Sequence, residues 1–471
     1  MGHGRLQLQV LSEEAVDQIQ ETAYRLLEDV GIALEHARAR EMLHGLGCKI
    51  DRGRTLIPRE LIAWALDQLT PLREYRTRDG APGFTLGDGQ IRFHSGGGQP
   101  IALDLDSGRQ RPATLQDIAD SSRLFDALPE VDQVVPLFTP QDVPGELLYI
   151  ESLAAMLYNT RKPVSCLARN PEEVPYLVEL AAACCGGVQA FRQQPNLLLT
   201  VSPISPLRFT EEITATILAV AETGASFKPT QAPTLGGTGP VSIAGALAQE
   251  HAEVLASFLL AAAARPGVPA LYCSRIFPLD PRTALTSDGP ETGMASAGAA
   301  QLAHRLGFSC DAYGLRGTYG RLTNALIPAL AGVDLLSGVG IGDGLTAGCE
   351  IAVLDADLVS LLKHIVAGYE VSEATLAYDV IKEVVGRDGI FLGERHTVRQ
   401  MRAGAVWLPR LSSATAGPMA ANLLAGARAR AREILSTHQV EPLPEEVCRS
   451  IDEILIRARS ELGPQRIVPN G

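Results

Sequence analysis

The sequence predicts an α/β fold, a TIM (β/α)8 barrel with helical extensions at both ends and a small β-insert. Short β-rich runs alternate with capped helices between residues 131 and 356, as strands and helices do in a barrel. Helical periodicity dominates the chain on both sides of that region. A doubly wound open sheet is the alternative, but no G-x-G-x-x-G follows the first run and opens a helix.

Eight β-rich runs carry the barrel prediction, and segments with helix-start signals separate most of them. Thr210-Glu211-Glu212 is one such signal, because a capping hydroxyl precedes two acidic side chains that the positive end of a helix dipole favours. The runs are Gln133–Phe138, Pro163–Ala168, Leu197–Pro203, Pro229–Leu235, Ala270–Ile276, Phe308–Gly314, Asp334–Gly340 and Cys349–Asp355.

The remaining chain divides into three further segments. Residues 1–87 form a predicted helical extension, whose first helix is capped by Ser12. Residues 88–130 form a β-hairpin insert and a linker, because Gly87–Asp106 reads as two short strands around a glycine turn. Residues 357–471 form a second helical extension. Outside the barrel, the main helices are expected at residues 12–30, 37–44, 58–69, 418–434 and 445–462.

Composition and charge favour a soluble protein with a large core. Hydrophobic residues make up 46% of the 471 positions and charged residues 20%. The net charge of −13 disfavours binding to nucleic acids or to anionic membranes. No apolar run approaches the ~18 residues of a membrane span, and the N-terminus lacks the apolar core of a signal peptide.

The eight cysteines form no C-x-x-C pair, and no histidine pair has a convincing metal-ligand spacing. Most of the cysteines lie among alanine, valine and leucine, which favours buried free thiols over a disulfide framework. We therefore expect a cytoplasmic protein that binds no metal itself.

The stretch from Tyr313 to Arg321, YGLRGTYGR, is the most unusual in the chain. Two tyrosines, two arginines and three glycines share one predicted loop at the carboxyl end of a strand, where barrel active sites lie. A tyrosine face attracts a quaternary ammonium by ~0.5–2 kcal/mol, and an arginine pairs with a carboxylate through two hydrogen bonds. Such a loop suits a zwitterion; the alternative is an ordinary polar loop with its tyrosines packed at the base.

Strand-end position and composition together select the candidate substrate-binding residues, while the catalytic residues stay unassigned. The aromatic candidates for an ammonium cage are Phe93, Phe138, Tyr313 and Tyr319; the candidates for carboxylate pairing are Arg316 and Arg321; the polar candidates are His94, Gln231 and His396.

A glycine-rich segment, LGGTGPVSIAG from Leu235 to Gly245, supports a different hypothesis. It lies at a predicted strand-to-helix junction, where backbone amides can hold an anion, although it lacks the ending of a nucleotide-binding P-loop. A tight turn is the structural alternative. Two other functions therefore stay open: a barrel enzyme that acts on a phosphorylated small molecule, and a non-catalytic protein that binds a small ligand.

An ordered set of motifs resembles the trimethylamine methyltransferase family, in particular its non-pyrrolysine members that act on glycine betaine and related quaternary amines. The motifs include LSEEAVDQIQETAYRLLEDVGI, PTLGGTGPVSIAGALAQEHAEVL, PALAGVDLLSGVG and FLGERHT, and they run through nearly the whole chain. In trimethylamine members the barrel carries pyrrolysine, which this chain lacks, and Tyr313 stands where the family often has lysine.

The resemblance implies a TIM barrel that moves a methyl group from a quaternary amine to cobalt(I) of a corrinoid. The corrinoid, a cobalamin, would be carried by a partner protein. A quaternary amine leaves as a neutral amine without gaining a proton, so catalysis requires mainly positioning and recognition of the cation. The implied partners are a corrinoid protein and a small quaternary amine, and we also expect a homo-oligomer.

Overall fold

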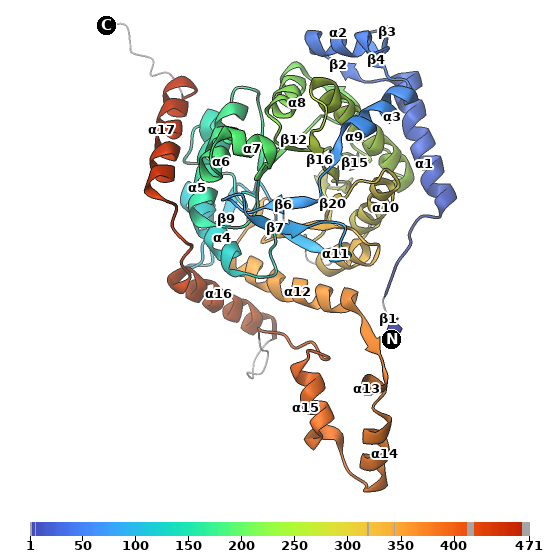
Figure 1. The fold of residues 1–471 in the computed structure, drawn as a ribbon, viewed down its shortest axis with the longest axis vertical. Coiled ribbons are helices and arrows are strands. Elements are labelled where there is room, and N and C mark those ends of the chain that lie inside the picture. Colours follow the sequence, from blue (N-terminus) through green and yellow to red (C-terminus); the bar gives the residue numbers. More distant parts are fainter. Residues whose placement is uncertain (1, 5, 318–319, 343, 412–418, 464–471) are drawn as a thin grey trace.

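The computed structural model of the chain describes residues 2–4, 6–317, 320–342, 344–411 and 419–463. Its centre is a set of parallel strands surrounded by helices, and a helical arm projects from this body (Figure 1). One large apolar core fills the space between strands and helices. The predicted α/β class is therefore confirmed.

The central strands form two sheets in which all neighbours are parallel. Parallel strands need long crossover connections, and helices provide them here. The first sheet has the order β11 (Val164–Leu167), β12 (Leu197–Val201), β14 (Ser226–Pro229), β16 (Pro269–Ala270) and β5 (Thr70–Pro71). The second has the order β17 (Tyr272–Ser274), β20 (Cys310–Tyr313), β21 (Leu335–Val339) and β8 (Arg92–Ser95).

Short contacts connect the two sheets. Only Leu271 separates β16 from β17 along the chain. On the other side, the segment after residue 132 forms isolated parallel bridges to both sheets, His94 to Gln133 and Val134 to Val164. Strands of both sheets therefore point their carboxyl ends in the same direction, and the loops that follow them gather at one end of the molecule.

The crossover helices follow the predicted alternation. Extended N-caps such as Thr210, whose hydroxyl accepts from the Ile213 amide, begin them where the sequence places a hydroxyl before acidic residues. The helices are α4 (Leu115–Ala127), α5 (Leu148–Asn159), α6 (Val174–Cys184), α7 (Val188–Gln193), α8 (Glu211–Thr223), α9 (Ile243–Ala264), α10 (Glu291–Arg305), α11 (Gly320–Leu330) and α12 (Cys349–Ala367).

Three expectations about strands differ from the structure. Gln133–Phe138 forms isolated bridges at Gln133, Val134 and Phe138 instead of a strand. The run Cys349–Asp355 is the first half of α12, because its apolar residues continue at helical spacing through Val359 and Leu362. Arg92–Ser95, expected in the β-insert, instead pairs with β21. Sequence periodicity indicates a strand but does not identify its partner, so the distant pairing was not visible. The four-segment division of the chain stays a prediction.

The rest of the predicted insert is present as an antiparallel pair, β9 (Ile101–Leu103) with β10 (Gln110–Pro112), and β9 also pairs with β22 (Thr346–Ala347). The predicted start of the strand at Pro229 was also too late, because β14 begins three residues earlier, at Ser226. The remaining short pairs are β2 (Ala33–Leu34) with β13 (Arg208–Phe209), β3 (Lys49–Asp51) with β4 (Arg54–Leu56), and β15 (Thr234–Leu235), β18 (Phe277–Asp280) and β19 (Leu285–Thr286).

The N-terminal extension is helical as predicted, with α1 (Glu13–Arg25), a π-helix (Leu26–Val30), α2 (Ala37–Gly45) and α3 (Arg59–Gln68). It also supplies a hairpin, β6 (Glu74–Arg76) and β7 (Pro82–Thr85), to the amino end of the strands. There Leu72, Tyr75 and Leu86 pack against strand residues such as Leu198 and Leu335 in a separate apolar cluster. This cluster, which we call the amino-end plug, closes that end of the strands.

Two long C-terminal helices pack on the body, α16 (Met419–Thr437) against α12 and α17 (Glu445–Glu461) against α6. Between α12 and α16 the chain forms the arm, residues 369–411, at the bottom of Figure 1. The arm contains β23 (Tyr369–Val371), α13 (Glu373–Leu376), α14 (Tyr378–Gly386), a 3-10 turn (Phe391–Gly393) and α15 (Arg395–Arg402). Its strand β23 pairs with β1 (Gly2–Gly4).

The long apolar helix α9 is a core helix that is buried on nearly all sides. Across the described ranges, no helix combines the length and the apolar character that crossing a membrane requires. All eight cysteines are free thiols, as predicted, and Cys48, Cys166, Cys273 and Cys310 are buried.

Candidate active site

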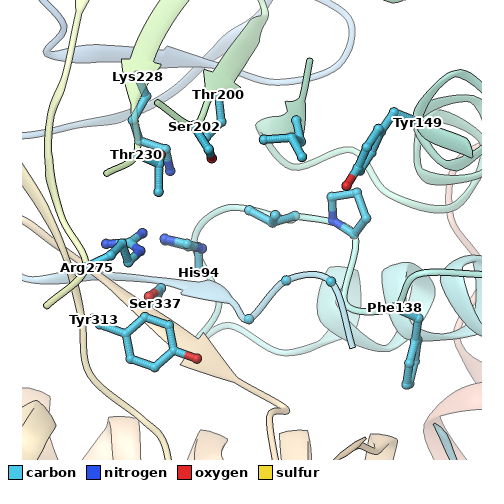
Figure 2. A pocket seen from close by; sticks show the side chains of 16 residues that line it. His94, Phe138, Tyr149, Thr200, Ser202, Lys228, Thr230, Arg275, Tyr313 and Ser337 are labelled. Carbon is cyan, nitrogen blue, oxygen red and sulfur yellow. The ribbon is translucent and has the colours of Figure 1, made fainter. Parts of the chain in front are cut away.

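A cavity of about 220 Å³ lies at the carboxyl ends of the central strands. β8 contributes His94, β14 contributes Lys228 and β20 contributes Tyr313, while Phe138 and Tyr149 come from the connection between the Val134 bridge and β11 (Figure 2). Carboxyl strand ends are where α/β enzymes place ligands, because loops there vary without disturbing the sheet. The cavity therefore occupies the expected position of an active site.

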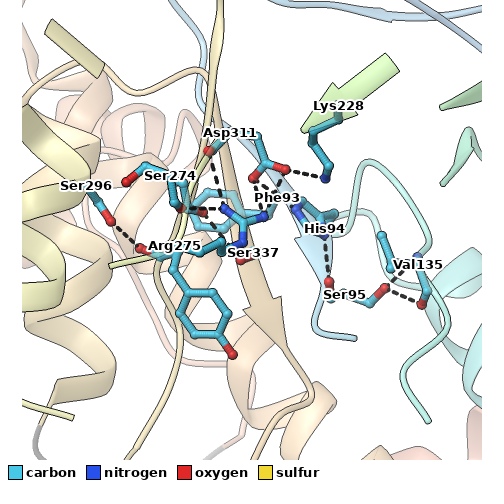
Figure 3. A network of polar contacts seen from close by, with 12 residues as sticks. Phe93, His94, Ser95, Val135, Lys228, Ser274, Arg275, Ser296, Asp311 and Ser337 are labelled. Atoms are coloured by element: carbon cyan, nitrogen blue, oxygen red, sulfur yellow. Dashed lines mark hydrogen bonds and ion pairs between the residues drawn. The ribbon is translucent and has the colours of Figure 1, made fainter. Parts of the chain in front are cut away.

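Four buried side chains form a charged cluster at this cavity (Figure 3). Asp311 Oδ2 lies 2.5 Å from Lys228 Nζ, and both Asp311 oxygens lie 3.0 Å from Arg275 Nη2. His94 Nε2 lies 3.2 Å from Asp311 Oδ1. The carboxylate of Asp311 is fully buried, whereas Lys228, Arg275 and His94 also line the cavity.

The cluster is net positive, with two cations around one carboxylate. Burial alone would raise the pKa of Asp311, but Arg275, Lys228 and His94 hold it well below its usual range, so Asp311 is ionised. Burial lowers the pKa of His94, which favours the neutral imidazole. A neutral imidazole has one N–H, yet the two ring nitrogens face the Ser95 carbonyl at 2.7 Å and Asp311. Only one of these contacts is a donated hydrogen bond at a time.

The backbone at Arg275 is fixed by Glu250, a residue that does not line the cavity. The Arg275 amide donates to Glu250 Oε1 of α9 at 2.8 Å, and the Arg275 Nη1 donates to the carbonyl of Ser274 at 2.8 Å. Burial raises the pKa of Glu250 to about 8, although hydrogen bonds, including that from the Arg275 amide, oppose this. Glu250 therefore fixes the strand end from which the guanidinium reaches the cluster.

Aromatic rings form other walls of the cavity. In Figure 2, Tyr149 and Phe138 lie on the side opposite Arg275 and His94. Tyr313 lies close to the charged cluster: the Arg275 guanidinium lies 5.7 Å from its ring centroid and that of Arg316 lies 6.0 Å away. Phe277 packs edge-on against Tyr313 with centroids 4.9 Å apart. Tyr313 is thus largely engaged by its own protein, whereas the Tyr149 and Phe138 rings carry no such contact among the described residues.

Both arginines expected to bind a substrate carboxylate are already paired within the protein, which corrects that expectation. Arg316 lies 3.1 Å from Asp288 and donates to Thr286 Oγ1 at 2.8 Å. Arg321 lies 2.6 Å from the buried Asp355 and lies outside the cavity. Sequence proximity to Tyr313 placed them in one loop, but α11 begins at Gly320 and turns Arg321 toward α12.

The other predicted residues divide between the cavity and distant positions. The structure brings His94, Phe138 and Tyr313 together. Neighbours along a strand point to opposite faces, so Phe93 is buried away from His94 and lies beneath Lys363. Gln231 and His396 do not line the cavity: Gln231 is buried and donates to Ser257, and His396 lies on the exposed arm beside the Ala374 carbonyl. Tyr319 lies outside the described residues.

The residues selected from the sequence did not include Lys228, Arg275, Asp311 or Tyr149. Lys228 was missed because the predicted strand began at Pro229, directly after it, whereas β14 begins at Ser226. A lysine beside apolar strand residues was the signal that the sequence offered. Arg275 lies near the end of the predicted run Ala270–Ile276, but its position in the sequence does not distinguish a cavity residue from an ion pair at the rim. Asp311 is buried and becomes informative only when its three partners are known.

The glycine-rich loop after β14 is a hydrogen-bonded turn. The amides of Gly237 and Gly239 both donate to the Thr234 carbonyl, and the Gly236 amide donates to the Gly239 carbonyl. Gly236 adopts a φ of +84°, a conformation that favours glycine. Because these amides have internal partners, they are not available to hold a phosphate, which disfavours the alternative of a phosphorylated substrate.

No group of three or more histidine, cysteine or acidic side chains in the described part of the chain is arranged to hold a metal ion.

The family model described as "Trimethylamine methyltransferase (MTTB)" matches residues 3–463. The chain belongs to the trimethylamine methyltransferase family. It is therefore a methyltransferase, and the family resemblance in its sequence motifs is confirmed.

Curated members of the trimethylamine methyltransferase family align over nearly the full chain. A glycine betaine methyltransferase of Desulfitobacterium hafniense (strain Y51) is 28% identical over 473 residues, with 97% of this chain and 98% of the relative covered. A trimethylamine methyltransferase MttB of Desulfitobacterium hafniense (strain DSM 10664 / DCB-2) is 27% identical over 476 residues, covering 97% and 95%. The trimethylamine methyltransferase MttB1 of Methanosarcina mazei is 25% identical, covering 96% of each.

Among solved structures, the monomethylamine methyltransferase MtmB of Methanosarcina barkeri matches with a TM-score of 0.48 at 15% identity, over 89% of this chain and 92% of that one. A hydroxylamine complex of MtmB also has a TM-score of 0.48, at 14% identity, over 95% and 94%.

Proposed function

We propose that this methyltransferase moves a methyl group from a small quaternary amine to the cobalt of a corrinoid carried by a separate protein. The proposal also takes the two sheets and the bridges between them as one closed (β/α)8 barrel. The observation that carries it is the cavity at the carboxyl strand ends, which combines aromatic rings with a charged wall in a chain of this family. The similarity to a glycine betaine methyltransferase supports a quaternary substrate.

The shape of the cavity fits a reaction with a second protein. Gly97, Gly98 and Ser202 line the cavity and are exposed, so the cavity opens to the outside at the strand ends. Reduced corrinoid cobalt supplies the nucleophile that accepts the methyl group. The chain's own residues hold the substrate, exclude water from the methyl carbon and orient the carbon–nitrogen bond toward the opening.

A quaternary substrate also fits the acid–base groups at the site. The departing amine is neutral when it leaves a quaternary nitrogen, so no side chain has to donate a proton to it. Burial raises the pKa of Tyr149 to about 12 and raises that of Tyr313, so both hydroxyls stay un-ionised near neutral pH. The Tyr149 ring thus offers a neutral π-face to a cation, and neither tyrosine needs to change charge during transfer.

The test is a methyl-transfer screen with free cob(I)alamin and purified protein. The panel contains glycine betaine, proline betaine, carnitine, choline and trimethylamine, and the absorbance change on cobalt methylation is followed. We expect transfer from at least one quaternary amine and none from trimethylamine. Transfer from trimethylamine alone would contradict the proposal, and so would the absence of transfer from every amine with both free cobalamin and corrinoid proteins of related systems.

We further propose a cytoplasmic homo-oligomer. The free thiols fit a reducing compartment. The arm supports self-association, because exposed apolar side chains are concentrated there and large exposed apolar patches commonly mark interfaces. These include Tyr369, Leu376, Tyr378, Val385, Ile390, Leu392 and Leu408, each at least 60% exposed.

A further inference from the structure

We propose that the charged end of the cavity binds the carboxylate of a zwitterionic substrate, with Lys228 as its main partner, and that the ammonium end faces the opening. This inference rests on the proposed function, because it assigns the two ends of a quaternary amine to two parts of the same cavity. It narrows the substrate class from quaternary amines in general to betaines, in which a carboxylate accompanies the cationic nitrogen.

The first support is the separation of charge and aromatic surface along the strands. Lys228 is the third residue of β14 and His94 the third residue of β8, so both lie within the strands. Phe138 and Tyr149 lie in the connection that follows the Val134 bridge, beyond the strand ends. Figure 2 shows the rings of Tyr149 and Phe138 well separated from Arg275 and His94. The cavity therefore has a charged inner end and an aromatic outer part.

The second support is the hydrogen-bonding capacity of Lys228. An ammonium has three N–H groups, and within the described residues Lys228 donates one hydrogen bond, to Asp311. Its side chain is only 4% exposed, so its remaining N–H groups have little access to water. Thr200 lies beside Lys228 on the neighbouring strand and lines the same part of the cavity, and its hydroxyl can donate to the same anion. A carboxylate placed there would satisfy donors that the folded protein leaves unused.

The third support is the net charge of the inner end. Lys228 and Arg275 outnumber Asp311 by one positive charge, and the neutral form of His94 adds none. A trimethylammonium group beside this cluster would be repelled, whereas a carboxylate would be attracted and would balance the charge. The ammonium is left with the outer rings, whose faces attract cations.

This orientation has a chemical consequence for the transfer. The carboxylate would lie deep and the N-methyl groups would point toward Gly97, Gly98 and Ser202, where the cavity opens. A methyl carbon must be approached on the side opposite the departing nitrogen. With the nitrogen anchored from below, that side faces the opening, through which a corrinoid on a second protein can approach.

The experiment measures binding by calorimetry without any corrinoid, so that it does not depend on methyl transfer. Glycine betaine is compared with choline, which has the same trimethylammonium group but a neutral hydroxyl end. In Lys228→Met, we expect the affinity for glycine betaine to fall at least tenfold, while that for choline changes less than twofold. Lys363→Met is the matched control, because Lys363 pairs with Asp132 outside the cavity, and it should change neither affinity.

Equal loss of both ligands in Lys228→Met, or no loss of glycine betaine, would overturn the proposal. The variant should fold, because the Arg275–Asp311 pair that remains is neutral. If it does not fold, the wild-type protein is tested with 3,3-dimethylbutanoate and 3,3-dimethylbutanol. These keep the shape but lack the cation, and the proposal requires that the carboxylate binds more tightly. Lys228-dependent carboxylate binding without methyl transfer from any betaine would contradict the proposed function alone.

Discussion

The ammonium of Lys228 lies 2.5 Å from Oδ2 of Asp311, between strands of the two central parallel sheets. Asp311 is also the shared partner of Arg275 and His94, so one carboxylate organises three basic side chains that come from three different strands or strand ends. Without this carboxylate, the ammonium of Lys228 and the guanidinium of Arg275 would lose their shared counter-charge in a buried place. The charge of the cavity therefore depends on Asp311, although Asp311 does not line it.

Replacing Asp311 should destabilise the protein more than replacing its partners. In Asp311→Asn, two buried cations lose their counter-charge, and breaking a buried pair in this way costs about 3–5 kcal/mol. Denaturant unfolding should show this loss, and the double variant Lys228→Met/Asp311→Asn should recover part of it. A double variant that is less stable than Asp311→Asn would contradict this account of the cluster.

Tyr149 should contribute to ligand binding through its ring rather than its hydroxyl. Tyr149→Ala should weaken both choline and glycine betaine by roughly 2- to 30-fold, which corresponds to a cation–π contribution of ~0.5–2 kcal/mol. Tyr149→Phe should retain affinity within about twofold. Calorimetry measures both variants, and Tyr158→Ala, on the same helix but outside the cavity, serves as a control. A large loss in Tyr149→Phe would instead assign the binding to the hydroxyl.

Because of Glu250, the free energy of unfolding should depend on pH between the ordinary pKa of this carboxyl and its higher pKa in the folded protein. Burial raises the pKa of this carboxyl from 4.5 to about 8. Because the folded pKa is the higher one, the contribution of protonated Glu250 is fully present below pH 4.5 and is lost as the pH rises toward 8. Relative to Glu250→Gln, the free energy of unfolding of the wild type should therefore fall over this range. The exposed Glu60→Gln should follow the wild-type curve.

Gly338 should be intolerant of a side chain, because two separate effects combine there. It adopts a φ of +117° within β21, and an added Cβ would lie 2.2 Å from the Leu315 carbonyl oxygen. Gly307 has a φ of +80° with no atom within 4 Å of such a Cβ. Gly307→Ala should cost only the backbone strain of about 1–3 kcal/mol, and Gly338→Ala should cost clearly more in thermal unfolding. If Gly307→Ala and Gly338→Ala lose the same stability, the contact between the added Cβ and the Leu315 carbonyl oxygen does not contribute.

The arm should control assembly. On α14, Tyr378, Ile381 and Val385 are exposed along one side at helical spacing, while Val384 is buried. Ile381→Asp/Val385→Asp should reduce the mass measured by light scattering at micromolar concentration, without changing the affinity for glycine betaine. A wild-type protein that is monomeric at that concentration would contradict the proposal.

The sequence predicted the α/β class and the N-terminal helices well, because caps and periodicity are local properties. His94, Phe138 and Tyr313, which the sequence selected partly by strand-end position, line the cavity, and their role in substrate binding stays a prediction. The partners of β8 and the pairing of Arg316 and Arg321 depend on contacts between distant residues, which periodicity does not contain. Lys228 was lost to a register error of a few residues.

The amino-end plug closes the strands from below, where Leu72, Tyr75 and Leu86 pack against Leu198 and Leu335. Among the described residues, the cavity therefore opens at the carboxyl ends of the strands and is closed at their amino ends. Under the proposed function, the betaine, the tertiary amine and the corrinoid-bearing partner would all use this opening. Under the proposed function the order of events is then compulsory: the amine has to enter before the partner docks, and the demethylated product has to wait until the partner withdraws. A tightly docked partner should therefore trap product and slow turnover.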